Sequence, residues 1–232
     1  MSIYAIGDLH LSFAPGLEKP MDIYGGVWIN HTEKLRQNWL QAVGEGDTVI
    51  LNGDISWALK TKDAWCDFEW IHQLPGKKVI FKGNHDLWWN SISKLNDLYD
   101  SITFVQNTAY EVEDYHLCGS RGWICPGSEE FTEQDEKIYK RELLRLEMAF
   151  DDAKKKGAKK MIGVLHFPPT SNSYSSSGFT EAFERVGAEM VVYGHLHGEE
   201  TYKTGLRGNY HGIEYKLVSL DYLDCKPLLI KE

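Results

Sequence analysis

Apolar runs alternate with amphipathic stretches along the chain. Five runs have few polar residues, at 3–6, 49–51, 79–81, 162–165 and 190–193. Short runs without polar alternation are typical of parallel strands that are buried on both faces. The segment after Asn30 instead carries Leu35, Trp39 and Val43 at spacings of four, which indicates a helix. Strands that alternate with helices predict an α/β fold.

The same pattern locates the other elements. A second helix is expected at 58–74. A third begins at Thr132 and carries an apolar stripe, followed by a lysine run and Gly157 that suit its C-terminal end. The stripe is Tyr139, Leu143, Leu146, Phe150 and Ala153. Strands are expected at 48–51, 77–81, 102–105, 115–118, 160–165, 189–193 and 214–220. The serine-rich segment 170–178 follows His166 and is interpreted as a mobile loop beside a functional site.

Polar residues of metal-ligand type follow the five apolar runs. They are Gly7-Asp8-Leu9-His10, Gly53-Asp54, Gly83-Asn84-His85-Asp86, His166 and Gly194-His195-Leu196-His197. In open α/β sheets, ligands bind beyond the carboxyl ends of the strands, so we expect these side chains at one edge of a sheet. Asp-x-His and His-x-His also direct their two side chains to one side of an extended segment.

Each cluster alone has a structural explanation. Asp8 and Asp54 are plausible turn residues, and an isolated His166 would more often be a core histidine. Seven ligand-type groups at strand ends favour a metal site, for which we expect two divalent ions. The nitrogen and oxygen ligands suit Mn, Fe or Zn, of which we favour Mn, whereas Mg is disfavoured by so many imidazoles.

A charge count indicates the substrate. Two divalent ions, two aspartates and a bridging hydroxide leave a formal charge of about +1, which attracts a phosphate. Two ions also suit in-line displacement at phosphorus, since one activates the water and both hold phosphoryl oxygens.

Composition limits the other classes of function. The chain has 232 residues and 42% apolar content, and we expect one domain over 1–232 because no division leaves either half a complete ligand set. A net charge of −9 disfavours nucleic acid and anionic membranes as partners. We see no apolar run long enough to span a membrane and no signal-peptide pattern. Four cysteines without CxxC pairing indicate reduced thiols and a cytoplasmic location.

The order GDLH, GD, GNHD, H, GHLH resembles the calcineurin-like metallophosphoesterase superfamily over residues 7–197. More loosely, the chain is similar to uncharacterised bacterial proteins predicted to be phosphohydrolases. The resemblance implies a four-layer αββα sandwich of two mixed sheets flanked by helices, with the metal site at the C-terminal ends of strands. It also implies the ligand sets: Asp8, His10 and His197 for one ion, Asn84, His166 and His195 for the other, and Asp54 between them.

In that family the histidine of GNHD is not a ligand. Carried over, His85 would lie near the leaving-group oxygen as proton donor or charge stabiliser, and Asp86 would orient it. Asn84 is expected to contact the substrate as well as an ion. The protein-phosphatase branch continues GD with Asp-Arg, whereas Ile55-Ser56-Trp57 follows here, so a phosphoprotein substrate is disfavoured.

Arg121 and three tryptophans each have two alternative roles. Arg121 would clasp a phosphate or form a surface salt bridge. Three tryptophans that follow the metal motifs would wall the substrate pocket or belong to the core, namely Trp57, Trp88 and Trp89. Four histidines lack ligand spacing and are interpreted as bystanders: His31, His72, His116 and His211.

The predicted function is a dinuclear metal-dependent phosphoester hydrolase, in which a metal-bridging hydroxide attacks phosphorus of a small phosphorylated substrate. The alternatives are phosphodiesterase, pyrophosphatase or nuclease activity in the same site, and a non-catalytic protein-binding scaffold. Scaffold members of the family lose ligands or the GNHD histidine, and this sequence keeps all of them. A hydrolase of carbon esters or amides would more often carry HExxH or three zinc-binding histidines.

Overall fold

A computed structural model describes all residues, 1–232, as two compact units. The first unit comprises Met1–Phe104 and Val218–Glu232, and the second comprises Val105–Leu217. None of the helices combines the length and apolar character that crossing a membrane requires. The expectation of one domain over 1–232 stays a prediction.

The first unit is built on a five-stranded mixed sheet in the order β11-β1-β2-β3-β4. Its strands are β1 (Ile3–Ile6), β2 (Thr48–Leu51), β3 (Lys77–Ile80), β4 (Ile102–Phe104) and β11 (Leu228–Lys231). β1 to β4 pair in parallel and β11 pairs antiparallel with β1. All four residues of β2 are buried, as the apolar run predicted for a strand covered on both faces.

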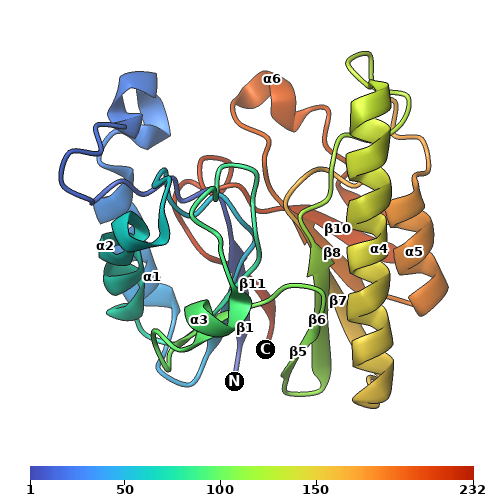
Figure 1. The fold of residues 1–232 in the computed structure, drawn as a ribbon, viewed down its shortest axis with the longest axis horizontal. Helices are drawn as coiled ribbons and strands as arrows, with labels where there is room; N and C mark the ends of the chain where they lie inside the picture. The colour runs from blue at the N-terminus through green and yellow to red at the C-terminus, as the bar shows by residue number, and fades with distance from the viewer. The chain divides into compact units, whose positions relative to one another are not determined.

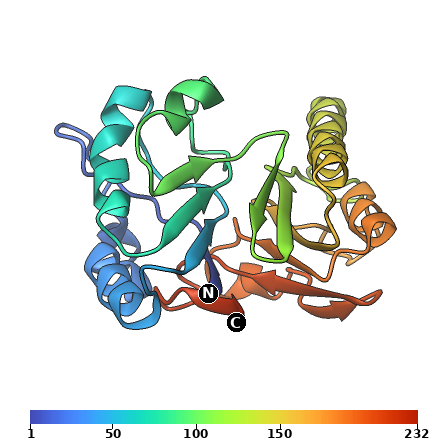
Figure 2. The same cartoon turned by 90° about the horizontal axis from the view of Figure 1, so that it is seen from below.

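Helices α1 (His31–Ala42) and α2 (Thr61–His72) cover this sheet and lie beside each other in Figures 1 and 2. Leu35 and Trp39 from α1 are fully buried in the same apolar core as Phe68 from α2. The shorter helical segments of this unit are η1 (Met21–Tyr24), η2 (Gly26–Trp28) and α3 (Ile92–Asn96). The helix expected at 58–74 is shorter at both ends. At its N-terminal side, Ser56 Oγ accepts the N–H of Ala58 in a turn that precedes the helix.

The second unit is built on a six-stranded mixed sheet in the order β5-β6-β7-β8-β10-β9. The strands are β5 (Ala109–Val112), β6 (Tyr115–Ser120), β7 (Lys160–Leu165), β8 (Met190–Tyr193), β9 (Gly208–Tyr210) and β10 (Ile213–Leu217). The four central strands pair in parallel, and β5 and β9 close the two edges antiparallel. A short helix, α6 (Glu199–Tyr202), follows β8.

Helices α4 (Glu133–Lys155) and α5 (Gly178–Val186) pack side by side on one face of this second sheet (Figure 1). Thr132 caps α4 in a capping box with Asp135, so the predicted start is confirmed. The apolar stripe of α4 faces the core: Tyr139, Leu146, Phe150 and Ala153 are buried and Leu143 packs against them.

The predicted fold class, two mixed sheets flanked by helices, is confirmed. The expectation that all ligand-bearing strands share one sheet edge is wrong. β1, β2 and β3 belong to the first sheet, whereas β7 and β8 belong to the second. The apolar runs are alike in both sheets, so strand patterns alone do not assign a strand to a sheet.

Candidate metal centre

The turns that follow β1 and β2 run side by side in the first unit. The N–H of Asp8 donates to the carbonyl of Gly53 at 2.9 Å, and that of His10 donates to the carbonyl of Asp54 at 3.0 Å. Asp8, His10 and Asp54 all have left-handed backbones, with φ of 58°, 47° and 51°. Such conformations cost energy outside glycine and concentrate at functional sites. Both carboxylates are thereby buried in a fixed position, at 0% and 1% exposure.

Glycines before the ligands allow these turns to approach one another closely. A Cβ at Gly83 would lie 2.1 Å from Asp54 Oδ1 and 2.2 Å from its main-chain nitrogen. At Gly7 it would lie 1.9 Å from Asn52 Oδ1. All three distances are shorter than real Cβ contacts, so packing favours glycine before Asp8 and before Asn84.

Asp86 joins the turn after β3 to the turn after β2. Its Oδ2 accepts the N–H of Asp54 at 2.9 Å and the N–H of Gly83 at 2.7 Å, and its Oδ1 accepts the N–H of Ile55 at 2.8 Å. A carboxylate that accepts several N–H groups holds their backbone in one arrangement. Asp86 therefore positions the Asp54 carboxylate, and its orientation of His85 stays a prediction.

His85 is placed beside the ligands by the same turn. Its main-chain N–H donates to Asp54 Oδ1 at 2.8 Å. Its ring centre lies 5.8 Å from that of His10 and 4.5 Å from that of Trp57. His85 and the preceding Asn84 are half-buried, so part of each side chain is exposed to solvent.

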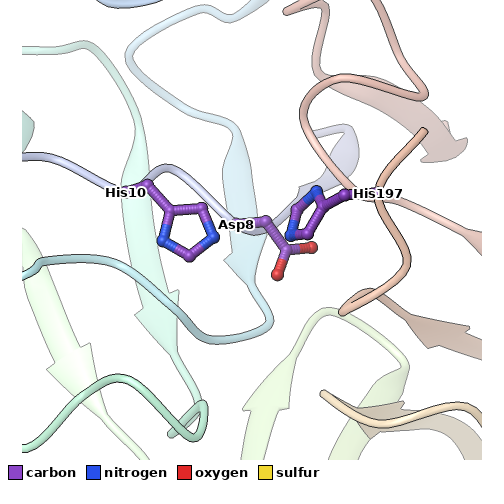
Figure 3. A group of neighbouring side chains, drawn as sticks. All are labelled: Asp8, His10 and His197. Atoms are coloured by element: carbon purple, nitrogen blue, oxygen red, sulfur yellow. The ribbon is translucent and has the colours of Figure 1, made fainter. Parts of the chain in front are cut away.

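Asp8 and His10 leave the loop after β1 in similar directions. Figure 3 shows the carboxylate and the imidazole on the same side of that loop. His10 Nε2 also lies 4.0 Å from Asp54 Oδ2. Two carboxylates and an imidazole from adjacent turns, three of the predicted ligands of the first unit, thus lie close together.

The second unit supplies the remaining imidazoles. His166 follows β7 and is fully buried, while His195 and His197 follow β8 and are half-buried. The N–H of Gly194 donates to the carbonyl of His166 at 3.0 Å, which ties the two turns together. The ring nitrogens His166 Nε2 and His195 Nδ1 lie 3.3 Å apart.

These donor groups fit divalent metal ions. Two nitrogens that bind one ion at about 2.1 Å, with an angle of about 90–110°, are separated by about 3.0–3.4 Å. The 3.3 Å between His166 and His195 lies in that range. Buried carboxylates and neutral imidazoles, without thiolates, suit Mn, Fe or Zn.

Two aromatic rings, those of Trp123 and Phe167, lie in sequence between Arg121 and the predicted ligand His195. Its guanidinium lies 4.3 Å from the ring centre of Trp123 and 3.5 Å from the buried carboxylate of Glu142. Trp123 packs at 4.8 Å on Phe167, which packs at 4.0 Å on His195. The ion pair is largely buried, with 14% of the Arg121 side chain exposed, and a phosphate contact of Arg121 stays a prediction.

The three candidate tryptophans have different surroundings. Trp88 is buried at 1% exposure among apolar side chains, and Trp89 packs against the same core. Trp57 instead stacks on His10, with ring centres 4.7 Å apart and an interplanar angle of 21°. Trp57 therefore contacts a predicted ligand through its ring.

His31 contacts the ligand turn, although its sequence position gave it no ligand spacing. Its Nε2 lies 3.0 Å from the carbonyl oxygen of Leu9, between Asp8 and His10. Burial lowers the pKa of His31, so its neutral form is favoured. The other three lie elsewhere: His72 contacts Ser101, His211 contacts Glu184, and His116 is buried in β6.

Asp67 was not identified from the sequence. It lies on α2, and its carboxylate accepts the hydroxyl of Ser56 and, at 2.8 Å, the N–H of Phe13. It therefore connects the loops that follow β1 and β2. Burial raises the pKa of Asp67. A lone aspartate within an amphipathic helix carries no sequence signal for such a contact.

Comparisons with known proteins agree with this fold. Solved structures with the same fold include a protein of unknown function, AQ665, from Aquifex aeolicus, at 19% identity and a TM-score of 0.54, covering 98% of this chain and 95% of that one. A phosphopantetheinyl hydrolase from Mycobacterium tuberculosis matches at 15% identity and 0.52, covering 94% and 88%. TT1561 from Thermus thermophilus matches at 15% identity and 0.53, covering 85% and 82%.

No curated protein matches the chain. The family described as calcineurin-like phosphoesterase matches residues 1–199, which include every predicted ligand. The chain belongs to the calcineurin-like phosphoesterase family and is a metal-dependent phosphoesterase.

Proposed function

We propose that this chain hydrolyses small phosphoesters with two divalent ions held by the seven predicted ligands. Asp8, His10 and His197 would hold one ion. Asn84, His166 and His195 would hold the other, with Asp54 between them. Two groups of ligand-type side chains support this assignment, Asp8 with His10 and His197 (Figure 3), and Asp54 with His166 and His195.

One observation carries the proposal. The turns after β1 and β2 hold two buried carboxylates in adjacent left-handed segments, bonded to each other through the main chain. A fold accepts two strained, buried acidic turns at the end of its sheet when a cation offsets their charge. The ions would supply Lewis acidity and a nucleophile at neutral pH, and Mn is favoured over Fe and Zn.

The chain's own residues account for departure of the leaving group. The half-buried His85 imidazole would donate its proton to the leaving-group oxygen as the bond from that oxygen to phosphorus breaks. Asp86 fixes the turn that carries His85, and the His85 N–H fixes Asp54. Arg121 is proposed to contact a phosphoryl oxygen while sharing its guanidinium with Glu142.

Phosphodiester or pyrophosphate cleavage is the alternative activity, because the same ligands serve all of these reactions. Nuclease action is disfavoured by the net charge of −9. A non-catalytic scaffold is disfavoured because the ligands and His85 are all retained. We also propose a reducing compartment such as the cytoplasm, since all four cysteines are free.

A substrate panel tests the proposal. The Mn-loaded protein is assayed with 4-nitrophenyl phosphate, bis(4-nitrophenyl) phosphate and inorganic pyrophosphate, with Asp54→Asn as the inactive control. We expect the monoester to have the highest kcat/KM. Preference for the diester or pyrophosphate would favour the alternative, and a fully loaded protein that hydrolyses none of the three would contradict phosphoesterase action.

A further inference from the structure

Lys19 lies beside the ligand turn of the first unit, on the loop that follows His10. Its Nζ is 5.9 Å from the centre of the Trp57 ring. Trp57 stacks on His10 at 4.7 Å and contacts His85 at 4.5 Å. A cation, an aromatic ring, a predicted ligand and the proposed proton donor are thus contiguous within one unit.

The backbone of Lys19 is held while its ammonium stays accessible. Ser12 Oγ donates to the carbonyl oxygen of Lys19 at 3.2 Å, which ties this residue to the start of its loop. The Lys19 side chain is exposed and forms no ion pair. In a chain with nine more acidic than basic residues, an unpaired cation beside the site is available to a substrate anion.

The position of His85 relates Lys19 to the leaving group. The distances from the ammonium to the Trp57 ring and from that ring to the His85 ring limit their separation to at most about 10 Å. His85 would protonate the leaving-group oxygen. An anionic group a few bonds beyond that oxygen would therefore come within reach of the flexible Lys19 side chain.

We propose that Lys19 and Trp57 form a leaving-group subsite for an anionic group. This deepens the proposed function and rests on it: the substrates would be phosphoesters whose leaving group carries a second negative charge, as a carboxylate or a further phosphate. Lys19 supplies the charge, and the Trp57 ring holds the lysine stem near the site. Both residues determine specificity, and neither takes part in bond cleavage.

A purely structural role for Lys19 has different consequences. If the ammonium served only to fix the loop over Trp57, its loss would affect all phosphoesters alike, whatever the charge of the leaving group. Electrostatic recognition instead changes the ratio between two substrates that differ only in a remote charge. That ratio therefore separates the two roles.

The test compares phenyl phosphate with 4-carboxyphenyl phosphate. We expect kcat/KM of the native protein to favour the carboxylated ester by about two- to five-fold beyond the effect of leaving-group acidity, the usual range for an exposed ion pair. The acidity effect is measured as the ratio of kcat/KM for the two esters in Lys19→Gln, which should lose the additional preference. In Lys19→Glu this ratio should be lower than in Lys19→Gln. Lys77→Gln is the matched control, because Lys77 is exposed at the N-terminal end of β3, whereas the predicted ligand Asn84 follows the C-terminal end.

Binding provides a readout without turnover. Calorimetry with phenylphosphonate and 4-carboxyphenylphosphonate should give the same preference of about two- to five-fold in the native protein. The preference should vanish in Lys19→Gln, decrease at high salt and weaken in Trp57→Leu more than in Trp57→Phe. An equal ratio of dissociation constants in native protein and Lys19→Gln would overturn the subsite. Failure to hydrolyse any ester would instead contradict the proposed function.

Discussion

At the scale of single residues, a substitution of His85 tests catalysis separately from metal binding. His85→Ala should retain both ions and lower kcat by about 10²–10⁴-fold for a poor leaving group such as phenolate, because general acid assistance is lost. The loss should be smaller for nitrophenolate, which hardly needs a proton. Steady-state kinetics on phenyl and 4-nitrophenyl phosphate, with metal analysis of the same sample, measure both effects.

His195→Ala is the matched comparison, since His195 faces His166 at 3.3 Å as a proposed ligand. It should lower metal content and activity together. If His85→Ala lowers kcat equally for both leaving groups, His85 acts by electrostatic stabilisation and not as a proton donor. Loss of an ion from that variant would show that the ligand shell is assigned wrongly.

Sequence patterns identified candidate ligands more readily than the residues that support their turns. Asp8, His10 and Asp54 follow apolar runs and were visible in the sequence, and their strained turns are consistent with that prediction. His31 and Asp67 were not found, because each contacts a ligand turn from a helix distant in sequence. Such contacts arise from tertiary packing, which periodicity does not describe.

At the scale of elements, the junction between α2 and β3 carries a buried cation. Lys78 on β3 donates to the carbonyls of Leu74 and Gly76 at 2.6 and 2.8 Å, and burial lowers the pKa of Lys78 to about 8. The unfolded chain holds this proton up to a pH of about 10.5. Between these values the unfolded state binds more protons, so this group makes stability rise with pH.

The free energy of unfolding of native protein minus that of Lys78→Met should therefore rise by up to about 3 kcal/mol from about pH 8 to about pH 10.5. Urea unfolding of both proteins across this range measures the difference. Ionisation of the buried thiols is common to both and cancels. A flat difference would mean that the carbonyl acceptors keep the Lys78 ammonium charged.

The serine-rich segment 170–178 is expected to influence substrate selection. Its last serine, Ser177, caps α5, and Tyr174 donates to the carbonyl of Lys203 after α6. Removing residues 173–176 while keeping Ser177 should change KM and the ranking of substrates, with metal content unchanged, because surface loops at strand ends select ligands. Collapse of metal binding, measured by elemental analysis, would mean that the segment supports the site structurally.

Buried strands were the most predictable elements. The expected strands 48–51 and 160–165 match β2 and β7 in both bounds. Edge strands β5, β9 and β11 were missed. In β5 and β9, polar residues weaken the apolar pattern. β11 is a short apolar run, Leu228 to Ile230, that periodicity does not distinguish from other structure. The strand expected at 214–220 ends at Leu217, because Val218 and Leu220 bond to the main chain of Gly7 instead.

At the scale of the whole molecule, the predicted ligands are divided between two units, four in the first and three in the second. We expect two metal ions per chain on full loading, because seven ligands exceed what one ion needs beside water and substrate. Elemental analysis after equilibration with Mn²⁺ measures this, with Asp54→Asn as control. Saturation at one ion with full activity would contradict the dinuclear assignment.

The first unit is assembled from residues 1–104 and 218–232, with the second unit between them in the sequence. The Gly7 turn, which precedes Asp8, bonds to Val218 and Leu220, and β1 pairs with β11. During translation these partners emerge from the ribosome only after all of the second unit. The main-chain bonds of the first acidic turn can therefore be completed only after the second unit and residues 218–220 have been synthesised.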